Sequence, residues 1–191
     1  MQTTSLALLP LTSHILPNGR LPIRIVEERY IRMIIDSAKT MSGFGVVMID
    51  PSQVGPFGRI STIGTHVEII DFYTLDDGFL GINVEGQQRF IIDAITTEPD
   101  GLKMAKVHYI TNWPDQIVNA NEAYLAEKLE GLYQQHADIN QLYTLKDMTN
   151  ISWVSQRWIE LLPLSVSEKQ MLLESSDCNR SLAILKTLMP T

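Results

Sequence analysis

The side chains best suited to chemistry in this sequence are four histidines, and their spacing is not that of a metal site. They are His14, His66, His108 and His136. His66 and His108 fall on predicted strands and could meet across the polar face of a sheet, where a metal would also need a carboxylate such as Glu68. The sequence offers no regular ligand spacing around them, so we expect no metal ligands in this chain.

Motifs for phosphate binding and for a catalytic serine are missing from the sequence. It contains no Gly-x-x-x-x-Gly-Lys-Ser/Thr loop and no Gly-x-Ser-x-Gly turn. Gly43 and Gly45 flank Phe44, but the third glycine of a dinucleotide fingerprint is absent, and the segment precedes a strand instead of opening a helix. We therefore predict a protein that is not an enzyme, with no catalytic residues and no cofactor.

Two arginines could either contact a ligand or form structural ion pairs. Arg29 lies at a predicted helix start, and Arg89 follows a strand glycine and precedes Phe90, so its side chain could point inward. We expect a structural ion pair between Glu27 and Arg89 that fixes the helix onto the sheet. A ligand contact by Arg89 is the alternative.

The clearest candidate for a binding surface is apolar. Phe57 lies in a loop with two prolines and two glycines, residues 50–59, where no periodic pattern supports burial. An exposed aromatic ring in such a loop could seat an extended peptide. We predict a peptide-binding surface where this loop approaches the turn at residues 17–22, formed by Pro17, Leu21, Pro22, Val54 and Phe57.

The elements that must position these residues differ between the two parts of the chain. Up to residue 115, short apolar or alternating segments are separated by turn signals such as Asp77-Gly78. The slip in alternation at Ile69-Ile70 indicates a bulge. The aromatic residues of these strands, Phe72 and Phe79 among them, are expected in the core. Strands are predicted at residues 6–11, 21–26, 44–49, 60–75, 79–85, 89–95 and 102–110, and one helix at 27–39.

This strand pattern with one early helix predicts a compact barrel or half-barrel. Its first two strands and the turn between them, Pro17-Asn18-Gly19, are expected to form one wall. From residue 116 onward the spacing of leucines and aromatics predicts helices instead. We place the boundary near Trp113-Pro114-Asp115, giving a β-rich subdomain, 1–115, and a helical subdomain, 116–191. Residues 167–170 match a capping box, and Gly131 inside a helix suggests close packing.

Composition restricts the class of protein further. The 191 residues include 45% hydrophobic ones, and the formal net charge is −7. Both parts are acidic, with 9 basic and 13 acidic residues up to residue 115 and 6 and 9 beyond it. This charge argues against a nucleic-acid binder. Cys178 has no possible disulfide partner, and we expect a buried structural thiol. With no signal peptide or transmembrane segment, we expect a soluble cytoplasmic protein without membrane contacts.

An ordered series of motifs resembles the N-terminal domain of the Lon family of ATP-dependent proteases. It comprises LALLPL, ILPNGRLPIRIVEERYIRMI, FGVVMI, STIGT and DGFLGINVEGQQRFII, then LLPLSVSEKQMLLESSD in the helical part. The resemblance covers about residues 6–189 and is strongest to short bacterial proteins made of that domain alone. Glu28, where proline is common in the family, and Asn18, inserted in the turn, depart from the pattern.

The resemblance implies an α+β fold, a PUA-like β-barrel with one early inserted helix followed by a C-terminal α-helical bundle. It also implies binding of protein substrates, whereas ATPase and proteolytic residues have no counterparts to carry over. We therefore expect a non-catalytic module that binds unfolded or exposed apolar protein segments, or docks on a protease or chaperone. Alternatives are an RNA-binding PUA-like domain and an uncharacterised hydrolase. A homodimer would be another way to bury an apolar patch.

Overall fold

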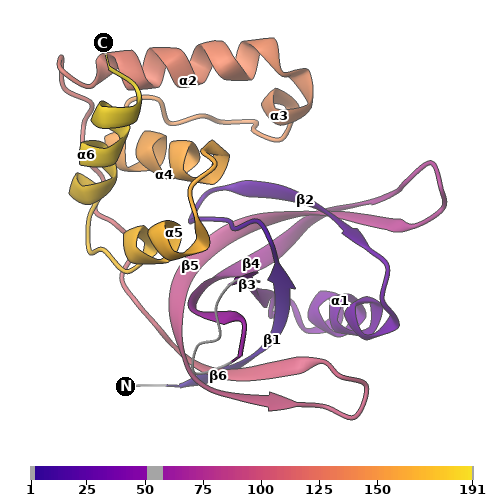
Figure 1. Cartoon of the computed structure of the whole chain (residues 1–191). Coiled ribbons are helices and arrows are strands. Elements are labelled where there is room, and N and C mark those ends of the chain that lie inside the picture. The colour runs from indigo at the N-terminus through magenta and orange to yellow at the C-terminus, as the bar shows by residue number, and fades with distance from the viewer. Residues whose placement is uncertain (1–2, 51–57, 191) are drawn as a thin grey trace. The chain divides into compact units, whose positions relative to one another are not determined.

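The computed structural model describes residues 3–50 and 58–190, and the chain divides into two compact units (Figure 1). The first is Met1–Thr111 and the second is Asn112–Thr191. The first unit ends four residues before the predicted end of the β-rich subdomain at residue 115. We describe each unit by itself.

The first unit is a six-stranded sheet that closes on itself. Its strands are β1 (Thr4–Leu11), β2 (Arg20–Ile25), β3 (Phe44–Ile49), β4 (Ile60–Thr74), β5 (Leu80–Thr97) and β6 (Lys103–Tyr109). They are ordered β2-β5-β4-β3-β1-β6, and β6 also pairs with β5. Strands β5, β4, β3, β1 and β6 therefore form a closed ring, which confirms the predicted barrel.

The first two strands do not form the wall that the sequence suggested. β1 pairs in parallel with β3 and antiparallel with β6, whereas β2 pairs with β5. The turn between them docks on β5, because the Asn18 amide donates to the Gly86 carbonyl at 2.8 Å and the Gly86 amide donates to the Gly19 carbonyl at 2.9 Å. Asn18 takes the left-handed conformation that this turn needs, with φ of 59°. Gly86 thus lies within one long strand and does not separate two.

Among the described residues of this unit, the one helix is α1 (Glu28–Thr40), which covers part of the barrel core (Figure 1). Its buried face carries Met33 and Ile34, which join an apolar cluster with residues of β1 to β5 such as Phe44. Burial of this stripe, more than helix propensity, is what stabilises a helix of this length. Phe72 and Phe79 are 50% and 38% exposed, so their predicted place in the core is wrong.

Local irregularities of the strands follow the sequence signals more closely. The register between β4 and β5 shifts between Ile69 and Asp71, which confirms the predicted bulge. Gly78, with φ of +84°, lies in the predicted hairpin turn, and the Leu75 amide donates to the Phe79 carbonyl at 2.9 Å.

The second unit is helical. Its elements are α2 (Ala123–Gln135), α3 (Ala137–Gln141), α4 (Ile151–Leu161), α5 (Val166–Leu173) and α6 (Asn179–Leu188). The indole of Trp158 on α4 donates to the Leu125 carbonyl of α2 at 3.0 Å, tying two helices together within the core. Cys178, before α6, is fully buried, as expected.

Two predictions about this unit are wrong in detail. The capping box is formed by Ser165 and Glu168, two residues earlier than expected, with the Ser165 hydroxyl accepting from the Glu168 amide. Gly131 on α2 has no atom within 4 Å of where a Cβ would lie, so close packing does not require it. Neither unit, over the described residues, has a helix long and apolar enough to cross a membrane.

Candidate peptide-binding groove

A groove of about 450 Å³ opens in the first unit, between the ends of several strands and the start of α1. We call it the β1–β2 groove. Its apolar lining comes from β1, β2, the start of α1, β3 and β4, and comprises Leu9, Pro10, Leu11, Ile23, Ile25, Val26, Tyr30, Ile49 and Ile60. Val26 is 52% exposed, which is unusual for an apolar residue that follows a core strand.

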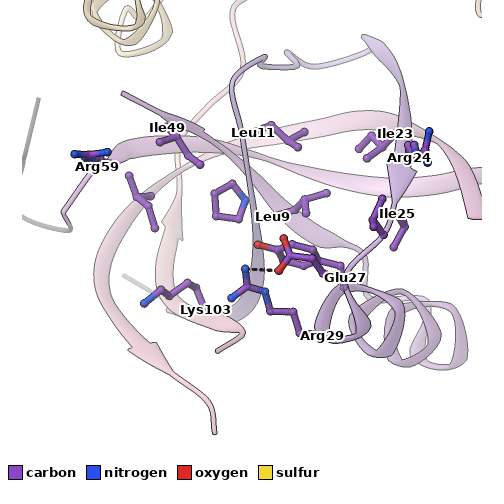
Figure 2. Close-up of a pocket in the computed structure, with 14 residues that line it drawn as sticks. Leu9, Leu11, Ile23, Arg24, Ile25, Glu27, Arg29, Ile49, Arg59 and Lys103 are labelled. Atoms are coloured by element: carbon purple, nitrogen blue, oxygen red, sulfur yellow. Dashed lines mark ion pairs between the residues drawn. The ribbon is translucent and has the colours of Figure 1, made fainter. Parts of the chain in front are cut away.

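Charged side chains, mostly basic, surround this apolar lining. They are Arg24, Arg29, Arg59, Lys103 and Glu27. In the view of Figure 2, Arg59 lies at one side of the groove and Arg24 at the other. Four cations and one carboxylate thus border the groove of a chain whose net charge is −7.

Two of these cations already have carboxylate partners. Arg24 pairs with Asp77 at 2.7 Å, and Arg29 pairs with Glu27 at 2.6 Å, the contact dashed in Figure 2. Both pairs are partly exposed to solvent, so each contributes little to stability. Their charges remain able to re-pair with an anionic ligand at small cost.

The other two cations form no ion pair with the described residues. Lys103 donates to the hydroxyl of Thr97 at 2.8 Å. Arg59 is exposed and forms no ion pair with any residue among 3–50 and 58–190. The two cations without an ion pair to a described residue therefore lie on the side of the groove formed by the ends of β3 and β4 and the start of β6.

Tyr30 places a polar group beside the groove. Burial raises the pKa of its hydroxyl, although the nearby Arg29 acts in the opposite direction. The Arg29 guanidinium lies 4.8 Å from the centre of the Tyr30 ring. Tyr30 is consequently a neutral hydrogen-bonding group at neutral pH, suited to peptide polar atoms and without a basic form for catalysis.

The residues predicted for peptide binding fall elsewhere or outside the described part of the chain. Pro17 is buried, Leu21 is half-buried against the core, and only Pro22 is exposed. Val54 and Phe57 lie outside the described residues. The groove adjoins the opposite end of β2 from the predicted turn. Sequence patterns gave no signal for it, because its residues come from six separate elements.

The expected ion pair between Glu27 and Arg89 is not formed, and each residue contacts another group. Glu27 pairs with Arg29, and the Arg89 guanidinium donates to the Thr111 carbonyl at 2.5 Å. The register of β2 and β5 places Ile25 opposite Leu80, nine residues along β5 from Arg89, or about 30 Å of strand. Arg89 is 1% exposed, and burial lowers its pKa to about 10. The contact of Arg89 therefore lies within the first unit, at the end of β6, and its structural role stays a prediction.

A second depression of about 440 Å³ lies at the end of α1 and along β4. It includes two of the most exposed apolar residues of the unit, Met41 at 88% and Phe72 at 50%, and a single charged residue, Glu68. The described residues contain no group of three or more His, Cys, Asp and Glu that could hold a metal. Neither depression therefore resembles a metal centre.

A closed β-barrel followed by a helical unit, with an apolar groove on the first unit, is the architecture of the described residues. The family model for the substrate-binding domain of ATP-dependent protease La (LON) matches residues 5–190. The chain therefore belongs to the LON substrate-binding domain family, which confirms the resemblance read from the motifs.

Relatives agree with this assignment. A Lon protease of Buchnera aphidicola subsp. Baizongia pistaciae is 29% identical over 134 residues, which are 67% of this chain and 17% of the relative. A Lon protease of Erwinia amylovora is 23% identical over 182 residues, 91% of this chain and 23% of the relative. The chain thus spans less than a quarter of the length of these curated relatives.

Solved structures support the fold. The crystal structure of a Lon N-terminal domain protein from Xanthomonas campestris has a TM-score of 0.76 and 30% identity, covering 98% of this chain and 99% of that one. The N-terminal domain of a Mycobacterium avium complex Lon protease has a TM-score of 0.57 and 19% identity, covering 96% and 97%. The second shows a similar fold alone.

Proposed function

We propose that this chain is a non-catalytic module that binds exposed apolar segments of other proteins, and that the β1–β2 groove is where they bind. The observation that carries the proposal is an apolar groove with a basic border in a chain of the LON substrate-binding family. Its partners would be unfolded proteins, or a protease or chaperone that presents such a segment. The cytoplasm, with its reducing conditions, suits the buried thiol of Cys178.

The groove has the composition that peptide recognition requires. Burying apolar side chains of a ligand against Leu11, Ile23 and Val26 supplies affinity, at about 25 cal/mol per Å² of apolar surface removed from water. Arg59 and Tyr30 supply polar contacts that orient the ligand. This combination favours a protein segment over RNA, whose charged backbone would meet a predominantly apolar surface.

A charge introduced into the groove tests the proposal. Val26→Asp should weaken binding of fluorescently labelled, dephosphorylated casein by about tenfold or more, because one apolar contact is replaced by a carboxylate that must be desolvated. The dissociation constant is measured by fluorescence anisotropy. Val26 is half-exposed, so the variant should keep the thermal stability of the native chain.

The matched control is Ile117→Asp. Ile117 is 88% exposed in the second unit and the substitution brings the same change in charge. Its dissociation constant for casein should stay within about twofold of that of the native chain, because an exposed charge outside the contact contributes little free energy. Equal effects of Val26→Asp and Ile117→Asp on casein affinity would reject the groove. So would a loss of affinity with Phe72→Asp, in the second depression, but not with Val26→Asp.

A further inference from the structure

The β1–β2 groove is bordered by strand edges. Four consecutive residues of β2 and its end, 23–26, line it, as do three consecutive residues of β1, 9–11. Successive side chains of a strand point to opposite faces, so a groove lying on one face would contact every second residue. Contact with consecutive residues means that the backbone edge itself faces the groove.

One side of β2 lacks a neighbour among the described strands. β2 ends the strand order and pairs with β5 alone. Pro22, opposite Asn83, has no N–H to donate, so the residues that bond to β5 are its neighbours Leu21 and Ile23. By the alternation of the ladder, the N–H and C=O of Arg24 point away from β5, along the free edge.

The pairing around β5 shows where a further strand would fit. One edge of β5 pairs with β4 over most of its length. The other edge of β5 pairs with β2 near Leu80 and with β6 from Phe90 onward. Where β6 is present the ring is closed, because β6 pairs with both β5 and β1. The pairing of β6 with β1 stops at Leu8 opposite Lys103. Beyond it, the ring is open between β2 and residues 9–11 of β1.

The charges around this opening select the kind of strand that would fill it. A guest strand would turn one set of alternating side chains toward Ile23 and Leu11 and the other set toward the border of the groove. The border carries Arg24, Arg29, Arg59 and Lys103 against Glu27. Acidic residues on the outer face would complement this charge, and basic residues would not.

From this geometry we infer that the groove binds an extended segment with alternating apolar and acidic residues, which adds to the free edge of β2 as a further strand and hydrogen-bonds to β2 alone. The inference rests on the proposed function and names its substrate class and binding mode. Main-chain hydrogen bonds to Arg24 supply part of the affinity, and the alternation of side chains supplies selectivity.

Backbone methylation of a probe peptide tests the mode on the native chain. The probe is a peptide of about nine residues that alternates valine and aspartate, the length of an ordinary strand. Two derivatives carry N-methyl groups either on all valines or on all aspartates. Only one of these sets faces β2, so one derivative should lose at least tenfold in affinity by isothermal titration while the other stays within about threefold. Loss in neither or in both rejects strand addition.

A variant of the protein gives a second measurement. Arg24→Pro removes the N–H at the free edge but none that bonds to β5, and Pro22 already shows that proline is accepted in this strand. It should bind the valine–aspartate probe at least tenfold more weakly than Arg24→Ala, which lacks the same ion pair with Asp77 but keeps the N–H. Equal affinities of the two variants overturn the inference.

A further peptide tests the charge selectivity, and the casein measurement tests the proposed function separately. A valine–lysine peptide should bind at least tenfold more weakly than the valine–aspartate peptide, and equal binding rejects the acidic preference. If casein binding responds to Val26→Asp while both methylated peptides bind alike, the groove is confirmed and strand addition fails. If casein binding ignores Val26→Asp, the proposed function itself fails.

Discussion

At the scale of single residues, Arg32 shows how the start of α1 is held against the turn between β5 and β6. Its guanidinium pairs with Glu98 and, at 2.7 Å, with Asp100. Asp100 also accepts a hydrogen bond from the Leu102 amide at 3.0 Å. The hydrogen bond from the Leu102 amide, followed by that from Arg32, holds the pKa of Asp100 below its usual value, although partial desolvation acts in the opposite direction. A carboxylate that is better stabilised in the folded state makes folding depend on pH.

The sign of this dependence gives a prediction for Asp100→Asn. Because the folded pKa lies below the ordinary value of 3.8, the ionised group stabilises the fold above that pH, and this contribution is lost as pH falls through the folded pKa. The asparagine can still accept from Leu102. The variant should therefore unfold at lower urea concentration than the native chain near pH 7, and the difference should shrink at about pH 3.

The control for this series is Asp76→Asn. Asp76 is exposed beside the β4–β5 turn, and the substitution removes the same charge without touching Arg32. Urea midpoints of the three proteins are compared at both pH values. A difference between Asp100→Asn and the native chain that is constant with pH would refute the link to ionisation.

At the scale of elements, glycine acts in opposite ways in the two units. A Cβ on Gly86 of β5 would lie 2.1 Å from the carbonyl oxygen of Leu16, part of the turn that precedes β2. That distance is far inside van der Waals contact, and the obstacle is backbone, which cannot rotate away. Gly131, in the middle of α2, faces open space. The first glycine permits strand and turn to meet, whereas the second only weakens its helix.

Alanine at these two positions should therefore change stability in opposite directions. Gly86→Ala should lower the free energy of unfolding by about 2 kcal/mol or more, because the turn and its two hydrogen bonds to β5 must move. Gly131→Ala should raise it by about 0.5–1 kcal/mol, the helix-propensity difference between the two residues. Urea denaturation followed by circular dichroism measures both, and a stabilised Gly86→Ala would disprove the docking of the turn.

Individual helices and strands could be predicted from the sequence, whereas their pairing could not. Alternation and helical spacing depend on neighbours in the chain, so β3, α1 and the bulge at Ile69 were predicted within a residue or two. Pairing partners are not local, and the β1–β2 wall was therefore wrong. The capping box was ambiguous, because Ser165 and Ser167 each precede Glu or Gln by three residues and only the position of the helix start decides between them.

The groove was harder to predict than the fold for a related reason. Val26, Arg59 and Lys103 meet in the groove although they belong to separate elements. No spacing in the sequence brings them together, and each alone looks like an ordinary surface residue. Topology supplies the connection, because the pairing of β6 with β1 ends at Leu8 and exposes the edge beyond it.

At the scale of the whole molecule, the charge distribution distinguishes a peptide-binding domain from an RNA-binding one. The net charge of −7 disfavours polyanions at the surface, but at physiological ionic strength salt screens exposed charges that are more than about 8 Å apart. The basic border of the groove acts inside that distance. A ligand that enters the groove meets Arg59 and Lys103, whereas one that only approaches the surface meets the overall negative field.

Two anionic ligands should therefore behave differently. The valine–aspartate peptide should bind at about 150 mM salt, while single-stranded poly(U) RNA of similar charge should show no binding in the same titration, because it offers neither apolar side chains for the groove nor amide groups for β2. Arg59→Ala should weaken the peptide by a few-fold, and Arg180→Ala, an exposed cation of the second unit, should not. Salt-sensitive RNA binding with an affinity equal to that of the peptide would instead favour an RNA-binding barrel, since nonspecific phosphate contacts lose affinity steeply as salt rises.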